Sequence, residues 1–143
     1  MKFHRDLKVY GDINFRGKCP KEEVEQITFF NQLKKLHPEI AELATHIKNE
    51  GKKTWGQINK DRQSGLNQGF SDIIIAGCPA CLIEMKRQDH TKSHWQENQE
   101  EKLLLAQSSG AFSCVALGYV GALEAVKDWL ECTKMMKNGL KTK

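Results

Sequence analysis

Residues 69–86 restrict the fold of this chain most, because they contain two short apolar runs on either side of a turn. The first run, 72–76, is rich in β-branched residues, and the second, 81–86, is apolar at alternate positions. Gly77 and Pro79 lie between the runs and are residues that favour turns. The pattern predicts a β-hairpin around which the rest of the chain is arranged.

Three ionisable residues lie at the open end of this hairpin: Asp72, Glu84 and Lys86. If the pairing is centred on Pro79, Asp72 lies opposite Lys86. Glu84 shares a face with Lys86, because side chains two apart on a strand point the same way. Taking charges out of water costs free energy, so their convergence beside buried strands indicates a functional site, such as one for a bound cation.

The chain of 143 residues has the length of one domain, and we expect 1–143 to form a single unit with a core over about 20–131. A hydrophobic fraction of 39% and a charged fraction of 28% argue against overall disorder. No apolar run approaches the ~20 residues of a membrane span, and the first residues lack a secretory signal, so we expect a cytoplasmic location. The net charge of +4 permits a polyanionic partner.

The cysteines are odd in number and unevenly spaced, which favours reduced thiols over a disulfide framework. Two of them, Cys78 and Cys81, have the CxxC spacing of half a zinc site or of a redox pair. No second CxxC or CxxH pair is present in the sequence to complete a zinc site. A redox pair normally opens a helix, whereas this pair lies in the predicted hairpin turn. We therefore interpret the two thiols as part of a tight turn.

Two segments before the hairpin are basic. Residues 1–19 are expected to form an irregular arm whose charges are either solvated or in contact with phosphate or a partner subunit. Residues 38–47 predict a short helix followed by an extended piece, and 48–68 form a basic, glycine-punctuated connection. Trp55 in this connection either stacks on a base or sugar of a nucleic acid or anchors the loop to the core.

The segment from Pro20 to His37 predicts an amphipathic helix, because proline suits the first helical position and acidic residues follow in the first turn. Phe29, Leu33 and Leu36 form an apolar stripe on one face. Projecting this stripe back by four residues reaches Glu25. Glu25 therefore either turns out to solvent near the helix start or reaches the charged end of the hairpin.

After the hairpin, Ser93-His94-Trp95-Gln96 fits a capping box and predicts a helix that ends near Gly110. Residues 112–117 predict a central strand. Residues 120–132 predict a last amphipathic helix, followed by a frayed basic tail to residue 143.

The order helix, hairpin, helix, strand, helix predicts an α/β fold: a small mixed β-sheet flanked by helices. The hairpin is antiparallel, and the crossover through the helix that Ser93 opens sets the 112–117 strand parallel to its neighbour. The charged residues then lie at one end of the sheet.

Asp72, followed after eleven residues by Glu84-Met85-Lys86, resembles the D…ExK signature of the PD-(D/E)XK nuclease superfamily, with its restriction-endonuclease-like core. Over about 20–131 the surrounding residues resemble the VRR-NUC family. One position departs from the family pattern, since Ser71 stands where proline is usual. The matching segments are Glu25-Gln26 opening a helix, Asn49-Glu50-Gly51, Gly69-Phe70-Ser71-Asp72, Ile83 to Lys86, and Gln99 eleven residues before Gly110.

The resemblance implies a Mg²⁺-dependent DNA endonuclease, with Mn²⁺ as a substitute ion. Stand-alone members of the family are often phage-encoded, which implies the cytoplasm of a host bacterium, and some resolve Holliday junctions as homodimers. This fits the chemistry, because cleaving a phosphodiester requires a cation to neutralise charge on the phosphate and a hydroxide near neutral pH. Carboxylate oxygens are suitable ligands for Mg²⁺.

The resemblance implies that Asp72, Glu84 and the backbone carbonyl of Met85 bind the metal, and that Lys86 holds the attacking water. The alternative for Lys86 is a salt bridge to Asp72 across the hairpin. The resemblance also implies that Glu25 binds a metal-coordinated water or a second cation.

Gln99 is expected to contact the phosphate or a metal-bound water, although a glutamine on a helix is also a common surface residue.

Two classes of function follow: an endonuclease selective for branched DNA, and a non-catalytic nucleic-acid-binding protein on the same scaffold. Within the first class, single-stranded or flap DNA is an alternative substrate.

Overall fold

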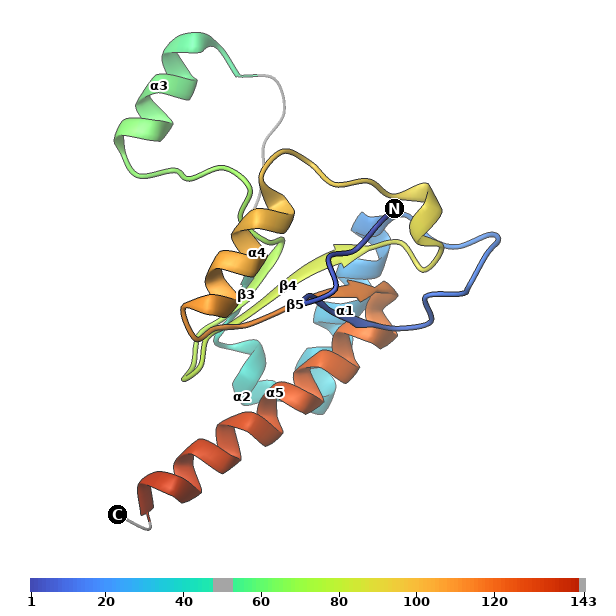
Figure 1. The fold of residues 1–143 in the computed structure, drawn as a ribbon, viewed down its shortest axis with the longest axis vertical. Coiled ribbons are helices and arrows are strands. Elements are labelled where there is room, and N and C mark those ends of the chain that lie inside the picture. The colour runs from blue at the N-terminus through green and yellow to red at the C-terminus, as the bar shows by residue number, and fades with distance from the viewer. Residues whose placement is uncertain (48–52, 142–143) are drawn as a thin grey trace.

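The computed structural model describes residues 1–47 and 53–141, and its strands form one five-stranded sheet in the order β1-β5-β4-β3-β2 (Figure 1). The strands are β1 (Lys8–Tyr10), β2 (Ala44–His46), β3 (Ile73–Ile75), β4 (Cys81–Lys86) and β5 (Phe112–Leu117). β5 is parallel to β1 and β4, and β3 is antiparallel to β2 and β4. The predicted α/β class and mixed sheet are confirmed, including the antiparallel hairpin and the parallel β5.

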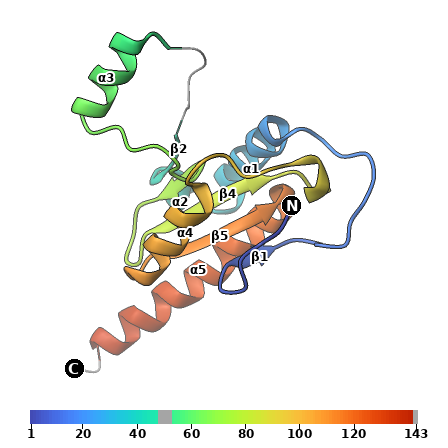
Figure 2. The same cartoon turned by 45° about the horizontal axis from the view of Figure 1, so that its top comes forward.

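Helices cover both faces of this sheet (Figure 2). Phe29 and Leu33 of α1 and Trp129 of α5 pack against the face that carries Ile83, whereas Leu103 of α4 packs against the opposite face. Burying side chains of this size contributes about 1.5–3 kcal/mol each. The helices are α1 (Glu22–Leu36), α2 (Pro38–Ala41), α3 (Trp55–Gln63), α4 (Gln99–Ser108) and α5 (Gly118–Lys141), with a short 3₁₀ turn at His90–Lys92.

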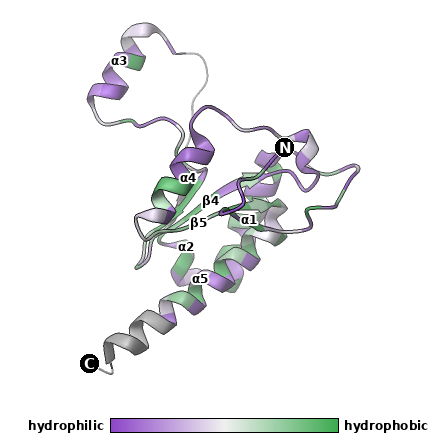
Figure 3. Ribbon diagram, viewed as in Figure 1, coloured by the Kyte–Doolittle hydropathy of each residue, from purple (hydrophilic) through white to green (hydrophobic). Residues whose placement is uncertain are grey.

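The sheet and its covering helices differ from α3 in hydropathy. Figure 3 shows hydrophobic residues on the strands and on α5, whereas α3 is mostly hydrophilic and stands clear of the sheet. No residue of α3 is buried. The sheet and its covering helices thus form the core, and α3 is carried outside it.

The β3–β4 hairpin differs from its predicted register. The pairing centres on Cys78 rather than on Pro79, so Asp72 lies opposite Glu84 instead of Lys86. The shift is two residues, and an even shift keeps every side chain on its predicted face. The three charged residues therefore still share one side of the sheet.

The first helix forms where predicted, with corrections at both ends. It begins at Glu22 after an extended Lys21, two residues later than the expected start at Pro20. Leu36 is 57% exposed rather than buried, because it is the last residue of α1, one turn beyond the buried Leu33.

The predicted capping box at Ser93 is wrong. The Ser93 hydroxyl accepts a hydrogen bond from the Arg87 N–H (3.0 Å) and donates to Glu22 Oε1 (2.7 Å), so it is not available to cap a helix. The helix starts later, at Gln99, after Asn98 with a positive φ of 67°. Its end near Gly110 agrees with the sequence.

Two elements form in segments that the sequence left irregular. Lys8–Tyr10 of the basic arm adds β1 to the edge of the sheet beside β5. Part of the basic connection forms α3, because the Thr54 hydroxyl caps it by accepting from the Gln57 N–H. The short helix and extended piece predicted over 38–47 are confirmed as α2 and β2.

The prediction of a frayed C-terminal tail is also wrong, since α5 continues to Lys141 (Figure 1). Its later residues include good helix formers, and Glu131 and Lys134 form an i,i+3 ion pair of 3.6 Å. Among the helices that the structure describes, none is long and apolar enough to cross a membrane.

Candidate active site

Asp72 and Glu84 face each other where the β3–β4 pairing ends. The Asp72 N–H donates to Glu84 Oε2 (3.2 Å), and the Met85 N–H donates to Asp72 Oδ2 (3.2 Å). Glu84 is only 1% exposed, and Asp72 is half-buried. The ion pair of this cluster joins Lys86 to Glu84, at 3.4 Å, and not to Asp72.

Both carboxyl groups are unfavourable in their charged form. Burial raises the pKa of Asp72, and the nearby charge of Glu22 adds to this, although Lys86 and the Met85 N–H act in the opposite direction. Burial and then the charge of Asp72 raise the pKa of Glu84 well above its usual range. Two carboxyl groups therefore lie against each other beside one ammonium, with the charge of Glu22 near enough to act on Asp72, an arrangement that a divalent cation would relieve.

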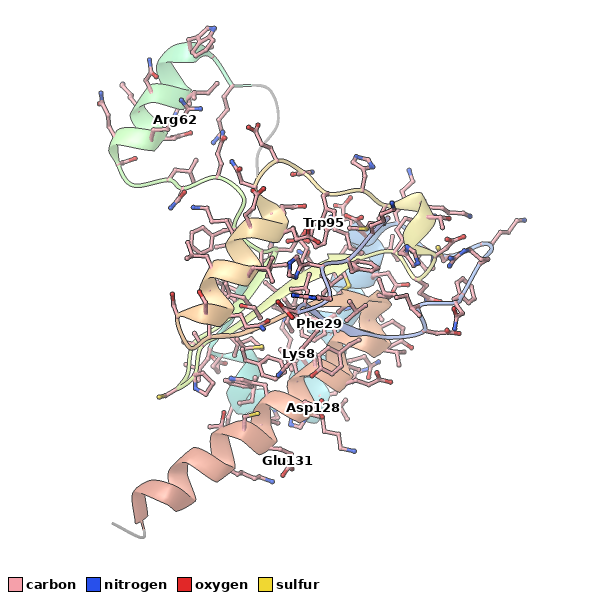
Figure 4. All side chains as sticks on the ribbon, viewed as in Figure 1. Lys8, Phe29, Arg62, Trp95, Asp128 and Glu131 are labelled. Atoms are coloured by element: carbon pink, nitrogen blue, oxygen red, sulfur yellow. The ribbon has the colours of Figure 1, made fainter. Side chains whose placement is uncertain are left out.

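The ammonium of Lys86 is enclosed, with 2% of the residue exposed. Its Nζ donates to the His94 carbonyl (3.0 Å) and to Gln99 Oε1 (3.2 Å), and it lies 5.5 Å from the centre of the Trp95 ring. Trp95 lies on the chain that leads into α4 and is partly buried against the core cluster that contains Leu103 (Figure 4). The ammonium is thus held in one position beside Glu84 by groups from residues 94–99.

Gln99 is brought to the same cluster by the start of α4. Its Nε2 donates to Glu84 Oε1 (3.0 Å), and its Oε1 accepts from Lys86 Nζ and from the Gln96 N–H. With 5% of the residue exposed, Gln99 is not the surface glutamine that was the alternative. A single amide therefore fixes both the carboxylate and the ammonium.

Glu25 is buried but lies apart from this cluster. It shares α1 with Phe29, on the face opposite Glu84, and its carboxylate accepts from the Tyr119 N–H (2.6 Å) and from Gln88 Nε2 (2.8 Å). The carboxylate therefore joins α1 to the start of α5. The alternative in which Glu25 turns out to solvent is wrong, and the structure does not bring it to Asp72.

Glu22 is the α1 carboxylate that does face the cluster, and the sequence reasoning missed it. It lies one turn before Glu25, is half-buried, and acts on the pKa of Asp72. A signal was present in the sequence: Glu22 and Gln26 are spaced i,i+4 and so share a helix face. That face lines the cleft described next.

An open cleft of about 600 Å³ lies beside the cluster. Asp72 and Gln99 line it, so the carboxylate and the amide are reached from solvent, while Glu84 and Lys86 lie behind them. The remaining walls come from α1, from the end of β2 at His46 and Ile47, and from the loop 66–70. The predicted Asn49-Glu50-Gly51 segment lies outside the described residues.

The donors at this cleft suit a hard divalent cation. Within 1–47 and 53–141, no three side chains among His, Cys, Asp and Glu gather as a metal-binding group. Asp72 and Glu84 supply two carboxylates, and the Met85 carbonyl faces Asp72 as well, because the N–H and C=O of a strand residue point to the same neighbour. Mg²⁺ keeps several waters and is commonly bound by one or two carboxylates.

The backbone entering this site carries Ser71 in place of the proline usual in the resembled family. Ser71 is 1% exposed, and its hydroxyl donates to the Ile73 carbonyl (3.3 Å). The side chain thus supports the start of β3 by a local hydrogen bond.

The CxxC pair lies at the far end of the hairpin from this cluster. The Cys78 thiol is exposed, and the Cys81 thiol is buried, which raises its pKa to about 12. Both thiols are free, like those of Cys19, Cys114 and Cys132. The pair forms the turn of the hairpin, as interpreted from the sequence.

A mixed sheet with helices on both faces, and a cluster of Asp72, Glu84 and Lys86 at one end, defines an α/β protein with a charged site at the edge of its sheet. No family model and no curated protein matches the chain in sequence. Among solved structures, a protein described as a VRR_NUC domain protein superposes with a TM-score of 0.64 over 82% of this chain and 92% of that chain, at 18% identity. The chain therefore has the fold of a VRR-NUC domain, and the predicted resemblance is confirmed at the level of the fold.

Proposed function

We propose that this protein is a Mg²⁺-dependent deoxyribonuclease of the VRR-NUC family. The observation that carries the proposal is the single hydrogen-bonded cluster of Asp72, Glu84, Lys86 and Gln99 beside an open cleft. A buried cluster of this kind costs folding free energy, which favours a functional explanation over a structural one. The shared fold with a VRR_NUC domain protein supports the choice of nuclease chemistry.

The residues divide the work of phosphodiester hydrolysis. Asp72, Glu84 and the Met85 carbonyl would hold Mg²⁺, or Mn²⁺ in its place, and the bound ion would supply charge neutralisation and a water of lowered pKa. Lys86 positions the attacking water, and the Gln99 amide holds Lys86 and Glu84 in place through its hydrogen bonds to both. Positioning of this kind contributes a large share of the rate in phosphoryl chemistry.

Glu22 is the α1 carboxylate that we assign to the cleft side of the site. Half-buried and close enough to Asp72 to raise its pKa, it is positioned to accept hydrogen bonds from water on a bound cation. The role proposed from the sequence for Glu25, as a ligand of metal-bound water or of a second ion, has less support, because its oxygens already accept from Tyr119 and Gln88.

We further propose branched DNA as the preferred substrate and a homodimer as the active form. Both proposals rest on the resemblance to Holliday-junction-cleaving members of the family. Flap or single-stranded DNA is the alternative substrate. A non-catalytic nucleic-acid-binding protein is the alternative function.

Cleavage of labelled four-way junction, flap, duplex and single-stranded DNA, each with Mg²⁺ and with EDTA, tests the proposal. We expect Mg²⁺-dependent cleavage, greatest on the junction, that is lost in Glu84→Gln. The mass in solution gives the oligomeric state. Binding without cleavage, or cleavage that survives Glu84→Gln, would show that the cluster is not the catalytic centre.

A further inference from the structure

The helix α3 exposes a large aromatic side chain outside the core. Trp55 is 77% exposed, the highest exposure among the large hydrophobic residues that the structure describes. The alternative in which Trp55 anchors the connection to the core is therefore wrong. An indole left in water loses the stabilisation that burial of its large apolar surface would give, and its exposed ring is available to a ligand.

The same face of α3 carries groups of the kind that contact nucleic acid. Asn59 and Arg62 follow Trp55 by four and seven residues, spacings that place all three side chains on one side of a helix. Both residues are exposed, and Figure 4 shows Arg62 on α3, away from the sheet. The Trp55 side of α3 thus offers an aromatic ring, an amide and a guanidinium together.

The charged side chains of α3 that have no ionic partner among the described residues are basic. The acid of the segment, Asp61, is already bound by Lys53 Nζ (2.7 Å) and by Gln57 Nε2 (2.8 Å). Lys60 and Arg62 form no ion pair with any residue that the structure describes. The surface is therefore complementary to phosphate.

A continuous surface joins α3 to the candidate active site. Arg62 and Lys102, together with the acidic Glu101, line an open hollow of about 460 Å³ between α3 and α4. This hollow and the cleft at Asp72 share the wall residues 66–68. A strand bound in the cleft would therefore lead along this wall toward α3.

Resting on the proposed nuclease function, we infer that α3 is a nucleic-acid-binding arm in which Trp55 stacks on an unpaired base and Arg62 contacts phosphate. Stacking requires an unpaired base, because the faces of paired bases are covered by their neighbours. The arm therefore favours DNA with unpaired nucleotides near the cut, such as a flap, or a junction whose base pairs open at the branch point. Aromatic stacking combined with basic side chains is the usual means of holding single strands.

Fluorescence anisotropy in EDTA, with a labelled flap and the matching duplex, tests the arm without any cleavage. Trp55→Ala should weaken flap binding by about 5- to 100-fold and leave duplex binding within about twofold, whereas Trp55→Phe should retain most of the flap affinity. Leu36→Ala, which removes another exposed apolar side chain, is the control and should change neither.

Arg62→Ala should weaken the binding of both the flap and the duplex. It should also lower the slope of log affinity against log salt concentration by about 1. Lys35→Ala, which removes an exposed charge from α1, should leave the slope unchanged. Equal flap binding by wild type and Trp55→Ala would overturn the inference. Cleavage by the wild type with Mg²⁺ is a separate measurement, so failure of the nuclease proposal is distinguished from failure of the arm.

Discussion

Two buried glutamates lie on opposite faces of the same sheet, in surroundings of opposite kind. Glu25 and Glu84 are each 1% exposed. Both carboxylates accept from two N–H donors, and that of Glu25 joins α1 to α5, but Glu84 also lies against a second carboxyl, that of Asp72, and a buried ammonium. A buried carboxylate whose partners are all donors stabilises the fold, whereas the repulsion between two facing carboxylates is relieved by a bound cation.

The largest difference expected between the two glutamates is in cleavage. Glu84→Gln keeps the shape of the side chain but removes a charge from the proposed metal site, and we expect cleavage to fall by at least about 100-fold. Glu25→Gln makes the same change on the other face and should retain activity within about fivefold. Initial cleavage rates with Mg²⁺ measure both. Equal losses of cleavage rate in Glu84→Gln and Glu25→Gln would show that the two glutamates do not differ in their role in cleavage.

Stability should respond in the opposite order. Glu25→Ala leaves the Tyr119 N–H and the Gln88 amide without their acceptor, and each buried donor left unpaired costs about 1–3 kcal/mol. We therefore expect the free energy of unfolding to fall by about 3 kcal/mol, as measured by urea titration. Asp72→Asn removes one of the two facing carboxyls, leaves the ion pair of Lys86 and Glu84 intact, and should change the free energy of unfolding by less than about 1 kcal/mol. A larger loss for Asp72→Asn than for Glu25→Ala would contradict this account.

Mg²⁺ should stabilise the protein through the Asp72–Glu84 side alone. At ten times its Kd, a ligand bound only by the folded state adds about 1.4 kcal/mol, which corresponds to a rise in Tm of several degrees. We expect this rise in the wild type and in Glu25→Gln, and its loss in Asp72→Asn. Thermal melts with Mg²⁺ and with EDTA measure it. An equal rise in Asp72→Asn would place the ion elsewhere.

The smallest effects are expected at the turn of the hairpin. Cys78→Ser should leave cleavage and Tm unchanged, because the thiol is exposed and far along the strands from Asp72. Burial raises the pKa of Cys81 to about 12, so its thiol stays protonated and should resist alkylation at pH 8 until the protein unfolds. Mass spectrometry after labelling counts the modified thiols. Rapid alkylation of Cys81 in the folded protein would disprove its burial.

The central hairpin and the identity of its charged residues could be predicted from sequence, because β-branched runs around a turn specify paired strands. The register could not be predicted, since a shift of two residues keeps the same faces buried. Only the geometry of the turn distinguishes the register centred on Cys78 from the one centred on Pro79. The predicted Asp72–Lys86 pairing became Asp72–Glu84 for this reason.

The choice between Glu22 and Glu25 also lay beyond the sequence. The apolar stripe put Glu25 in line with buried residues and left open whether it turns out to solvent or reaches the site, because only the crossing of α1 over the sheet decides what that face meets. α3 was missed because it has no apolar stripe, and its one strong signal was the Thr54 cap. Gln99 was found through the family resemblance, although the helix that carries it starts later than Ser93 suggested.

The position of Mn²⁺ in crystals of the protein tests the central claim most directly, since anomalous scattering locates the ion without reference to activity. The account predicts one Mn²⁺ bound by the carboxylates of Asp72 and Glu84, on the face of the sheet that α4 covers. No ion between these carboxylates at saturating Mn²⁺, or an ion bound at Glu25 in their place, would contradict it.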